Sequence, residues 1–159
     1  MNANFPISLA DIMTREVHYV APTEPLQAVA RTMSEAGISS LLVGPPEATV
    51  GIVTESNLLR AMHWQLPGTT PISQLMSQPL ITAPPGLDLL AARKLLEAHH
   101  IRHLVVLAED GRTAGIVSET DFRRHLGALA FSHLRTLEGV MDHEMPRLPP
   151  TARLAEALA

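Results

Sequence analysis

Two segments of the chain place a hydroxyl side chain three residues before an amide or a carboxylate. They are Gly51–Asn57 (GIVTESN) and Gly115–Asp121 (GIVSETD). In each, an aliphatic stretch gives way to a helical pattern, so Thr54 and Ser118 are expected at helix N-termini. Free backbone N–H groups and the helix dipole favour an anion such as a phosphate there. The same spacing also resembles a capping box, which only begins a helix, and one residue can do both.

Other reaction chemistries are poorly supplied. The chain has 8 histidines and no cysteine. His99 and His103 have the i, i+4 spacing of some zinc ligands, but a strand pattern begins at Ile101, so the helix should end between them. We expect His99 and His100 at a helix C-terminus. Ser118 lies in no G-x-S-x-G elbow, so neither a metal site nor a catalytic site is predicted.

The composition excludes several classes of protein. The chain has 159 residues, of which 46% are hydrophobic and 18% charged, as one domain or two small ones would be. A net charge of −4 and an aromatic content of 3% argue against nucleic-acid binding. No apolar run is long enough for a membrane span, and the N-terminus does not resemble a signal peptide. The lack of cysteine fits a reducing cytoplasm, where we expect the protein to lie.

An internal repeat organises the chain. Met13 precedes Pro22 by nine residues and Leu26 by thirteen, and Met76 stands in the same relation to Pro85 and Leu89. The offset between the copies is 63 residues for Met13 and Met76 and 64 for Gly51 and Gly115.

Each complete copy predicts the order β-α-β-β-α. In the first copy the helix that begins near Leu26 has Thr23 as its expected N-cap and Gly37 just past its end. The other expected elements are strands at 17–20, 38–43, 50–53, 80–83, 101–107 and 114–117, and helices from Leu89, at 55–63 and at 119–129. Turns at Gly44–Glu47 and Glu109–Gly111 should join hairpins. We divide the chain into a first motif (8–64), a linker (65–71), a second motif (72–128) and an extension (129–159).

This pattern resembles the CBS (cystathionine-β-synthase) domain family in its tandem form, the Bateman module. The resemblance is carried by the Met-Thr and Met-Ser openings, the two Gly-initiated segments described above and Ile101–Val106 (IRHLVV). It covers residues 8–128 in two copies and a further start near residue 139. It implies an α/β (α+β) fold in which two β-α-β-β-α repeats pack as a pseudo-two-fold pair.

The resemblance also implies a regulatory function without catalysis. Paired CBS motifs bind AMP, ADP, ATP or S-adenosylmethionine in clefts between the copies, require no cofactor, and control an effector domain in cis or in trans. The expected ligand-binding residues are Thr54, Asn57, Thr82, Arg102, His103, Ser118, Asp121 and Arg124. The alternative is an interaction module whose clefts are vestigial and whose role is dimerisation.

The two copies are chemically unequal. Asp121 can accept hydrogen bonds from both vicinal hydroxyls of a ribose, whereas Asn57 offers one acceptor oxygen and no charge. The second copy also has Arg102 and His103 where the first has serines, followed by Arg123 and Arg124. A phosphorylated ligand should therefore prefer the second site, although Arg123 and Arg124 also fit a solvated helix face.

Two further expectations concern assembly and extent. The segments 55–63 and 119–129 carry more apolar residues than one intramolecular contact needs, so we expect a homodimer. They are Leu58, Leu59, Met62, Phe122, Leu126 and Leu129. Met141, Pro150 and Leu154 keep the repeat spacing a third time. This predicts a third motif continuing beyond residue 159, in the N-terminal part of a bacterial signalling protein whose effector is a diguanylate cyclase or a kinase.

Overall fold

The computed structural model describes the backbone of residues 7–130 and the side chains of residues 7–125. Both complete repeats belong to one compact unit that extends to Leu126. The expected third repeat start at Met141 lies outside the described residues, as does the 129–159 extension beyond its first two residues.

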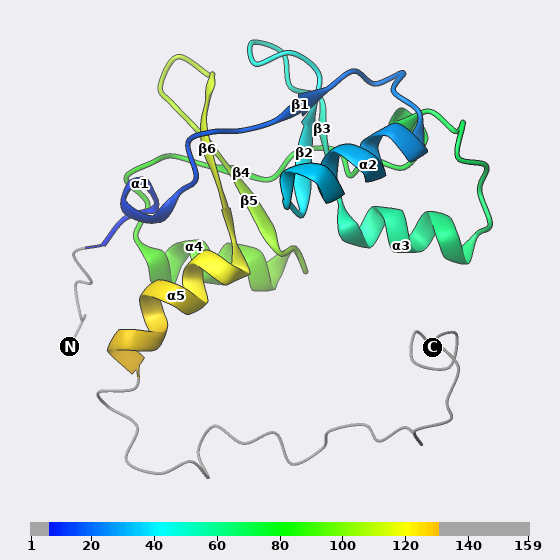
Figure 1. Ribbon diagram of the computed structural model, residues 1–159. Coiled ribbons are helices and arrows are strands. Elements are labelled where there is room, and N and C mark those ends of the chain that lie inside the picture. Colours follow the sequence, from blue (N-terminus) through cyan, green and yellow to red (C-terminus); the bar gives the residue numbers. More distant parts are fainter. Residues whose placement is uncertain (1–6, 131–159) are drawn as a thin grey trace, which may run out of the picture. The chain divides into compact units, whose positions relative to one another are not determined.

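Two three-stranded sheets form the centre of this unit (Figure 1). The first has the order β1 (Tyr19–Val20), β2 (Ser40–Val43) and β3 (Gly51–Thr54), and the second has the order β4 (Thr82–Ala83), β5 (His103–Leu107) and β6 (Thr113–Ser118). In both, the first pairing is parallel and the second is an antiparallel hairpin. The mixed fold class is confirmed. We call the sheet β1–β3 with its packed helices the first half, and β4–β6 with its helices the second half.

The helices flank the strands in the same order in each copy. They are α1 (Leu9–Ile12), α2 (Leu26–Ala36), α3 (Glu55–His63), the 3₁₀ turn η1 (Ile72–Gln74), α4 (Leu89–Ala98) and α5 (Glu119–Ala130). The prediction of Thr23 as an N-cap is wrong. Helix α2 begins after Pro25, whose ring fixes φ near the value that the chain needs there, and no side chain caps it.

The ends of α2 and α4 follow the expectations. Gly37 closes α2 in the left-handed conformation with φ 63°, a region that glycine enters without steric cost. His99 is the C-cap of α4, and the next residue, His100, has φ 51°. His99 and His103 therefore lie on either side of a helix end and do not share a helical face.

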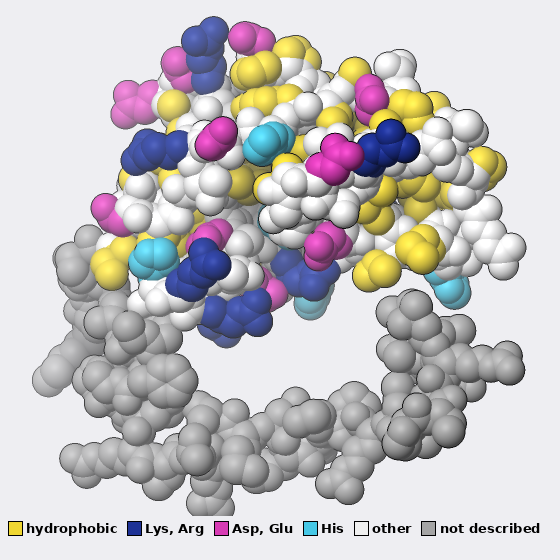
Figure 2. All heavy atoms as spheres, viewed as in Figure 1, with side chains coloured by type: hydrophobic (Ala, Val, Ile, Leu, Met, Phe, Trp, Pro, Cys, Tyr) yellow, Lys and Arg dark blue, Asp and Glu magenta, His cyan; other side chains and the backbone are white. Residues whose placement is uncertain are grey.

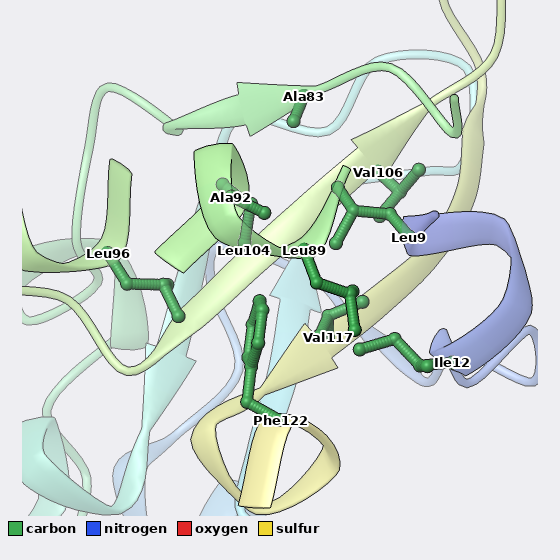
Figure 3. Close-up of a cluster of buried hydrophobic side chains, with 10 residues drawn as sticks. All are labelled: Leu9, Ile12, Ala83, Leu89, Ala92, Leu96, Leu104, Val106, Val117 and Phe122. Atoms are coloured by element: carbon green, nitrogen blue, oxygen red, sulfur yellow. The ribbon is translucent and has the colours of Figure 1, made fainter. Parts of the chain in front are cut away.

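The opening segments of the two repeats are exchanged. Leu9 and Ile12 of α1 are buried in the core of the second half, against Leu89, Val117 and Phe122 (Figure 3). In return, Ile72 and Leu75, at the opening of the second repeat, are buried in the core of the first half. Neither repeat of the sequence therefore completes its own core.

Backbone pairing holds each exchanged segment in place. The backbone groups of Thr14 and Ile116 exchange two hydrogen bonds of 2.9 Å, and those of Ser77 and Ile52 exchange two of 2.8 and 3.1 Å. The glycine that begins each motif permits this contact, since a Cβ on Gly115 would lie 2.7 Å from the Thr14 carbonyl oxygen. A third apolar cluster, formed by Leu42, Ile52 and Val105, contains residues from strands of both sheets.

Candidate functional site

A cleft of about 680 Å³ lies between the two halves, and we call it the Asp121 cleft. The first half supplies the approach to β1, the end of α2 and the turn after it, and the second half supplies the start of α5. The lining residues are Thr14, Glu16, Val17, His18, Ala30, Met33, Ser34, Gly37, Ile38, Ser39, Ser40, Leu42, Glu55, Leu58, His103, Ile116, Ser118, Thr120, Asp121 and Arg124.

Asp121 lines this cleft and forms hydrogen bonds through one of its two carboxylate oxygens. The backbone N–H and the hydroxyl of Ser118 donate to its Oδ2 at 2.8 and 2.7 Å, so the carboxylate caps α5. Within the described part of the chain no hydrogen bond reaches Oδ1. Asp121 thus combines the capping role with an acceptor that is free for a ligand hydroxyl, and such charge-assisted bonds are the stronger ones.

His103 and Ser39 face each other across the two halves in the same cleft. The His103 Nε2 atom lies 3.0 Å from the Ser39 hydroxyl oxygen. Burial lowers the pKa of His103 below its ordinary value, and the neighbouring charge of Arg102 lowers it further, against smaller opposing effects of Glu55, Asp121 and Glu119. The ring is therefore neutral at physiological pH and joins the two halves by a neutral hydrogen bond.

A second cleft, of about 590 Å³, belongs to the second half alone, and we call it the Arg102 cleft. Its lining residues are Arg93, Leu96, Glu97, His100, Ile101, Arg102, Glu119, Phe122 and Arg123. By the repeat offset, Leu96, His100 and Phe122 match Met33, Gly37 and Leu58 of the Asp121 cleft. The Arg102 cleft is thus the counterpart of one side of the Asp121 cleft. Figure 2 shows basic side chains where α4 and α5 lie.

The counterpart of Asp121 is enclosed. Asn57 is only 2% exposed. Its Nδ2 donates to the carbonyl of Leu75 at 2.7 Å and to the hydroxyl of Ser77 at 3.2 Å. Its Oδ1 accepts from the backbone N–H and the hydroxyl of Thr54, both at 2.8 Å. The residue before Asn57, Ser56, accepts a hydrogen bond from Arg102 through its hydroxyl. The amide nitrogen and the amide oxygen of Asn57 therefore both form their hydrogen bonds within the protein.

The sequence profile of the CBS domain matches residues 9–63 and 72–128. The chain belongs to the CBS domain family. It is 30% identical over 115 residues to a CBS domain-containing protein of Bacillus subtilis, YhcV, with 72% of this chain and 81% of that protein covered. It is also 31% identical over 118 residues to an uncharacterized protein of Methanopyrus kandleri, with 72% and 60% covered.

Some relatives carry the CBS pair as a small part of an enzyme. A homoserine O-acetyltransferase of Methanococcoides burtonii is 30% identical over 121 residues, which are 76% of this chain and 24% of the enzyme. The chain thus spans a quarter of that relative and 60% of the Methanopyrus protein. The part that is shared with these proteins is the CBS pair.

Solved CBS structures share the fold. A CBS domain pair in complex with 5′-methylthioadenosine and S-adenosyl-L-methionine superposes with a TM-score of 0.71 at 19% identity, covering 77% of this chain and 98% of that one. A CBS domain protein from Pyrobaculum aerophilum complexed with AMP has a TM-score of 0.70 at 24% identity, covering 79% and 99%.

The structure brings together only some of the residues that the sequence suggested. His103, Ser118, Asp121 and Arg124 line the Asp121 cleft. Arg102, which was expected beside them, lines the Arg102 cleft together with Arg123. The expected grouping is corrected because the CBS motifs pair crosswise: the turn that faces Asp121 comes from the first copy.

Three other expected ligand-binding residues lie apart from the Asp121 cleft. Thr54 and Asn57 bond to each other and line neither cleft, and Thr82 is an exposed residue of β4 that lines neither. Sequence reasoning missed Thr14, Glu16 and Glu55, which line the Asp121 cleft. The repeated Met-Thr and Met-Ser openings were the available signal for Thr14.

Two kinds of site are not found in the part of the chain that the structure describes. No group of three or more His, Asp and Glu side chains there could hold a metal ion. Among the described helices, none has both the length and the apolar character that crossing a membrane would require.

Proposed function

We propose that this chain is a regulatory module that binds one adenosine-containing molecule in the Asp121 cleft. The observation that carries the proposal is the carboxylate of Asp121, a lining residue of the cleft, which Ser118 fixes through one oxygen and whose other oxygen accepts no hydrogen bond from the described residues. A ribose offers two adjacent hydroxyls to such an acceptor. A ligand that lacked one of them would leave the carboxylate short of a partner, which disfavours its binding.

The remaining surface of the cleft suits a nucleoside. Its volume of about 680 Å³ lies within the range of small-molecule pockets. Val17, Ile38 and Ile116 supply apolar surface for a purine ring, and Thr120 lies in the first turn of α5, where backbone N–H groups attract polar or anionic groups. The complexes of related CBS pairs with AMP and with S-adenosyl-L-methionine support this ligand class.

A ligand in this position would report its presence to an effector in cis or in trans. Both halves line the cleft, and Ser39 and His103 already join them by a hydrogen bond. Bound ligand would therefore favour one arrangement of the two halves over others, and a partner that contacts both would respond to that shift. We propose this control of an effector together with ligand binding.

A second candidate function is dimerisation without a ligand. It is favoured by apolar side chains that α3 leaves on the surface, where Figure 2 shows hydrophobic groups on the side of α2 and α3. Leu59 and Met62 of α3 and the following Trp64 are exposed, the last beneath the guanidinium of Arg60 at 5.3 Å. A homodimer that covers this face is the expected assembly, and light scattering at micromolar concentrations would measure it.

Calorimetry and thermal denaturation test the ligand proposal. Adenosine, AMP, ADP, ATP and S-adenosylmethionine are titrated into the intact chain, and a ligand at about 100 times its Kd should add roughly 2.7 kcal/mol of stability. Asp121→Ala should weaken binding about tenfold or more, since a charge-assisted hydrogen bond is lost. Asp88→Ala is the matched control, because Asp88 caps α4 through the Ala91 N–H and lies outside the cleft.

The outcomes separate the two candidate functions. Binding that Asp121→Ala weakens and Asp88→Ala leaves unchanged supports the ligand site. A chain that binds none of the five compounds and forms a dimer is an interaction module. Equal losses in both variants would show that helix destabilisation, and not the lost acceptor, causes the effect.

A further inference from the structure

The Asp121 cleft is rich in negative charge. Among the described residues, three carboxylates line it, those of Glu16, Glu55 and Asp121, and the one permanently charged cation is Arg124. Neither Glu16 nor Glu55 forms an ion pair within the described part of the chain, where the ion pairs are Arg93–Glu97 and Arg112–Glu47. His103, which also lines the cleft, stays neutral because burial disfavours its charged form.

Most of the arginines whose positive charge would offset the negative charge of a polyphosphate line the other cleft. Arg93, Arg102 and Arg123 line the Arg102 cleft, together with Glu97 and Glu119. Arg102 donates to the hydroxyl of Ser56 in α3, and Arg123 donates to the hydroxyl of Thr120, a residue that lines the Asp121 cleft. Among the described residues, Arg124 is thus the arginine that lines the Asp121 cleft, whereas Arg102 and Arg123 line the other cleft and border this one beside His103 and Thr120.

We propose that Glu16 and Glu55 make the Asp121 cleft select adenosyl ligands by charge, in favour of a ligand with a cationic group such as a sulfonium and against di- and triphosphates. This inference rests on the proposed function. Asp121 recognises the ribose that all these ligands share, so it does not discriminate among them. In this proposal the part of the ligand that differs lies beside Glu16 and Glu55, the two carboxylates that line the cleft in the described residues besides Asp121.

The expected size of the effect is modest, since both glutamates are exposed to solvent. A pair of unit charges about 4 Å apart in water interacts by roughly 1 kcal/mol, which corresponds to about a fivefold change in affinity. Salt should reduce the effect, because exposed charges are screened over about 10 Å at 0.1 M ionic strength. Each added negative charge on the ligand should therefore cost several-fold in Kd at low salt.

The test uses ligands that differ mainly in charge. S-adenosylmethionine and S-adenosylhomocysteine differ by one methyl group and its positive charge, and adenosine, AMP, ADP and ATP form a graded anionic series. Calorimetry on the intact chain is run at pH 8, above the ordinary pKa of histidine of about 6.5, and at 50 and 300 mM salt. We expect S-adenosylmethionine to bind about fivefold tighter than S-adenosylhomocysteine, and affinity to fall from AMP to ATP.

Two variants assign the effect to its residues. Glu16→Gln and Glu55→Gln should each reduce the ratio between S-adenosylmethionine and S-adenosylhomocysteine by more than they change the affinity for adenosine. Glu109→Gln, in the β5–β6 turn outside the cleft, should leave the ratio as it is.

The possible failures are distinguishable. If adenosine binds but the ratio is near one, or if ATP binds as tightly as AMP, the charge selection is overturned and the adenosine site stands. If neither glutamate variant changes the ratio, the assignment to these residues is overturned. If no adenosyl compound binds, the proposed function and this inference fall together.

Discussion

Replacing Asn57 with aspartate tests whether this side chain is an internal brace. Asn57→Asp exchanges the amide nitrogen for an oxygen and keeps the shape of the side chain. The nitrogen now donates to the Leu75 carbonyl at 2.7 Å and to the Ser77 hydroxyl at 3.2 Å. An ionised carboxylate can donate neither bond, and it would place a negative oxygen against the carbonyl oxygen of Leu75.

The expected cost follows from these contacts. The hydrogen bond to the Leu75 carbonyl is lost, at about 1 kcal/mol, whereas the Ser77 hydroxyl can turn and donate to the new oxygen. The repulsion between this oxygen and the Leu75 carbonyl, in a site that is 2% exposed, adds about 2 kcal/mol. Arg60 still donates to the Leu75 carbonyl at 3.0 Å, so that carbonyl is not left without a partner. We expect the free energy of unfolding to fall by about 3 kcal/mol, which a domain of ordinary stability, 5 to 15 kcal/mol, survives.

The reciprocal variant is the control. Asp121→Asn keeps an oxygen that can accept from the Ser118 N–H and hydroxyl, so its free energy of unfolding should change by less than about 1 kcal/mol. Urea denaturation without ligand measures both variants. Calorimetry should then show weaker adenosine binding for Asp121→Asn and unchanged binding for the folded fraction of Asn57→Asp.

Two results would refute this reasoning. One is an Asn57→Asp protein as stable as the parent, which would mean that the four hydrogen bonds of Asn57 do not brace the fold. The other is a second equivalent of bound nucleotide in Asn57→Asp, which would mean that the missing carboxylate alone had closed the first site.

Three further predictions concern stability. Gly115→Ala should destabilise the fold by more than 1 kcal/mol, as measured by urea denaturation, because its Cβ would lie 2.7 Å from a backbone oxygen, whereas Gly86→Ala, with open space around it, should change little. Leu9→Ala should cost about 2 to 5 kcal/mol, since Leu9 is fully buried in the second half, whereas Leu90→Ala, 50% exposed, should stay within about 0.5 kcal/mol. Because the pKa of His103 is lowered in the folded state, the stability that its neutral ring contributes is present above about pH 6.5 and is lost as pH falls through its folded-state pKa. The decline of unfolding free energy from pH 7.5 to 5 should be smaller in His103→Gln, and an identical decline would contradict the assignment.

The elements of the fold were accessible from the sequence because each leaves a local signal. Short strand-like apolar runs and glycine turns marked both hairpins, and β2 and β5 lie within the predicted strands. The helix predicted at 55–63 has those bounds, since a hydroxyl at its start and an apolar stripe along it define both position and face. The error at Thr23 arose because Pro25 can begin a helix without a side-chain cap.

The exchange of the opening segments left no comparable signal. Helix α1 has four residues, too few for a periodic pattern, although Ser8 and Asp11 carry the same capping pair that marks α3 and α5. Nothing local states that Leu9 packs against the later repeat and not against its own. That choice depends on a long-range backbone pairing, that of Thr14 with Ile116, which periodicity does not encode.

The same gap explains the partial prediction of the site. Ser118 and Asp121 could be identified because their spacing is a local feature of one helix start. The neighbours of Asp121 could not, because they are supplied by another part of the chain. Residues that follow one another in the second copy, Arg102 and His103, line different clefts, so proximity in sequence was a poor guide to the charge that surrounds a ligand.

Asp121 and Asn57, which occupy matching positions in the two copies, differ in the hydrogen bonds that they form with their neighbours. By the repeat offset, the counterparts of Leu75 and Ser77 beside Asp121 are Ile12 and Thr14. An amide can both donate to a carbonyl and accept from a helix start, so Asn57 is satisfied wholly within the protein. A carboxylate only accepts, and among the described residues Asp121 finds donors for Oδ2 alone. Its other oxygen must be satisfied by water or by a ligand hydroxyl. Asp121 therefore keeps one oxygen for a ligand hydroxyl, whereas the groups of Asn57 are all paired with its enclosing neighbours, and we expect one bound ligand per chain.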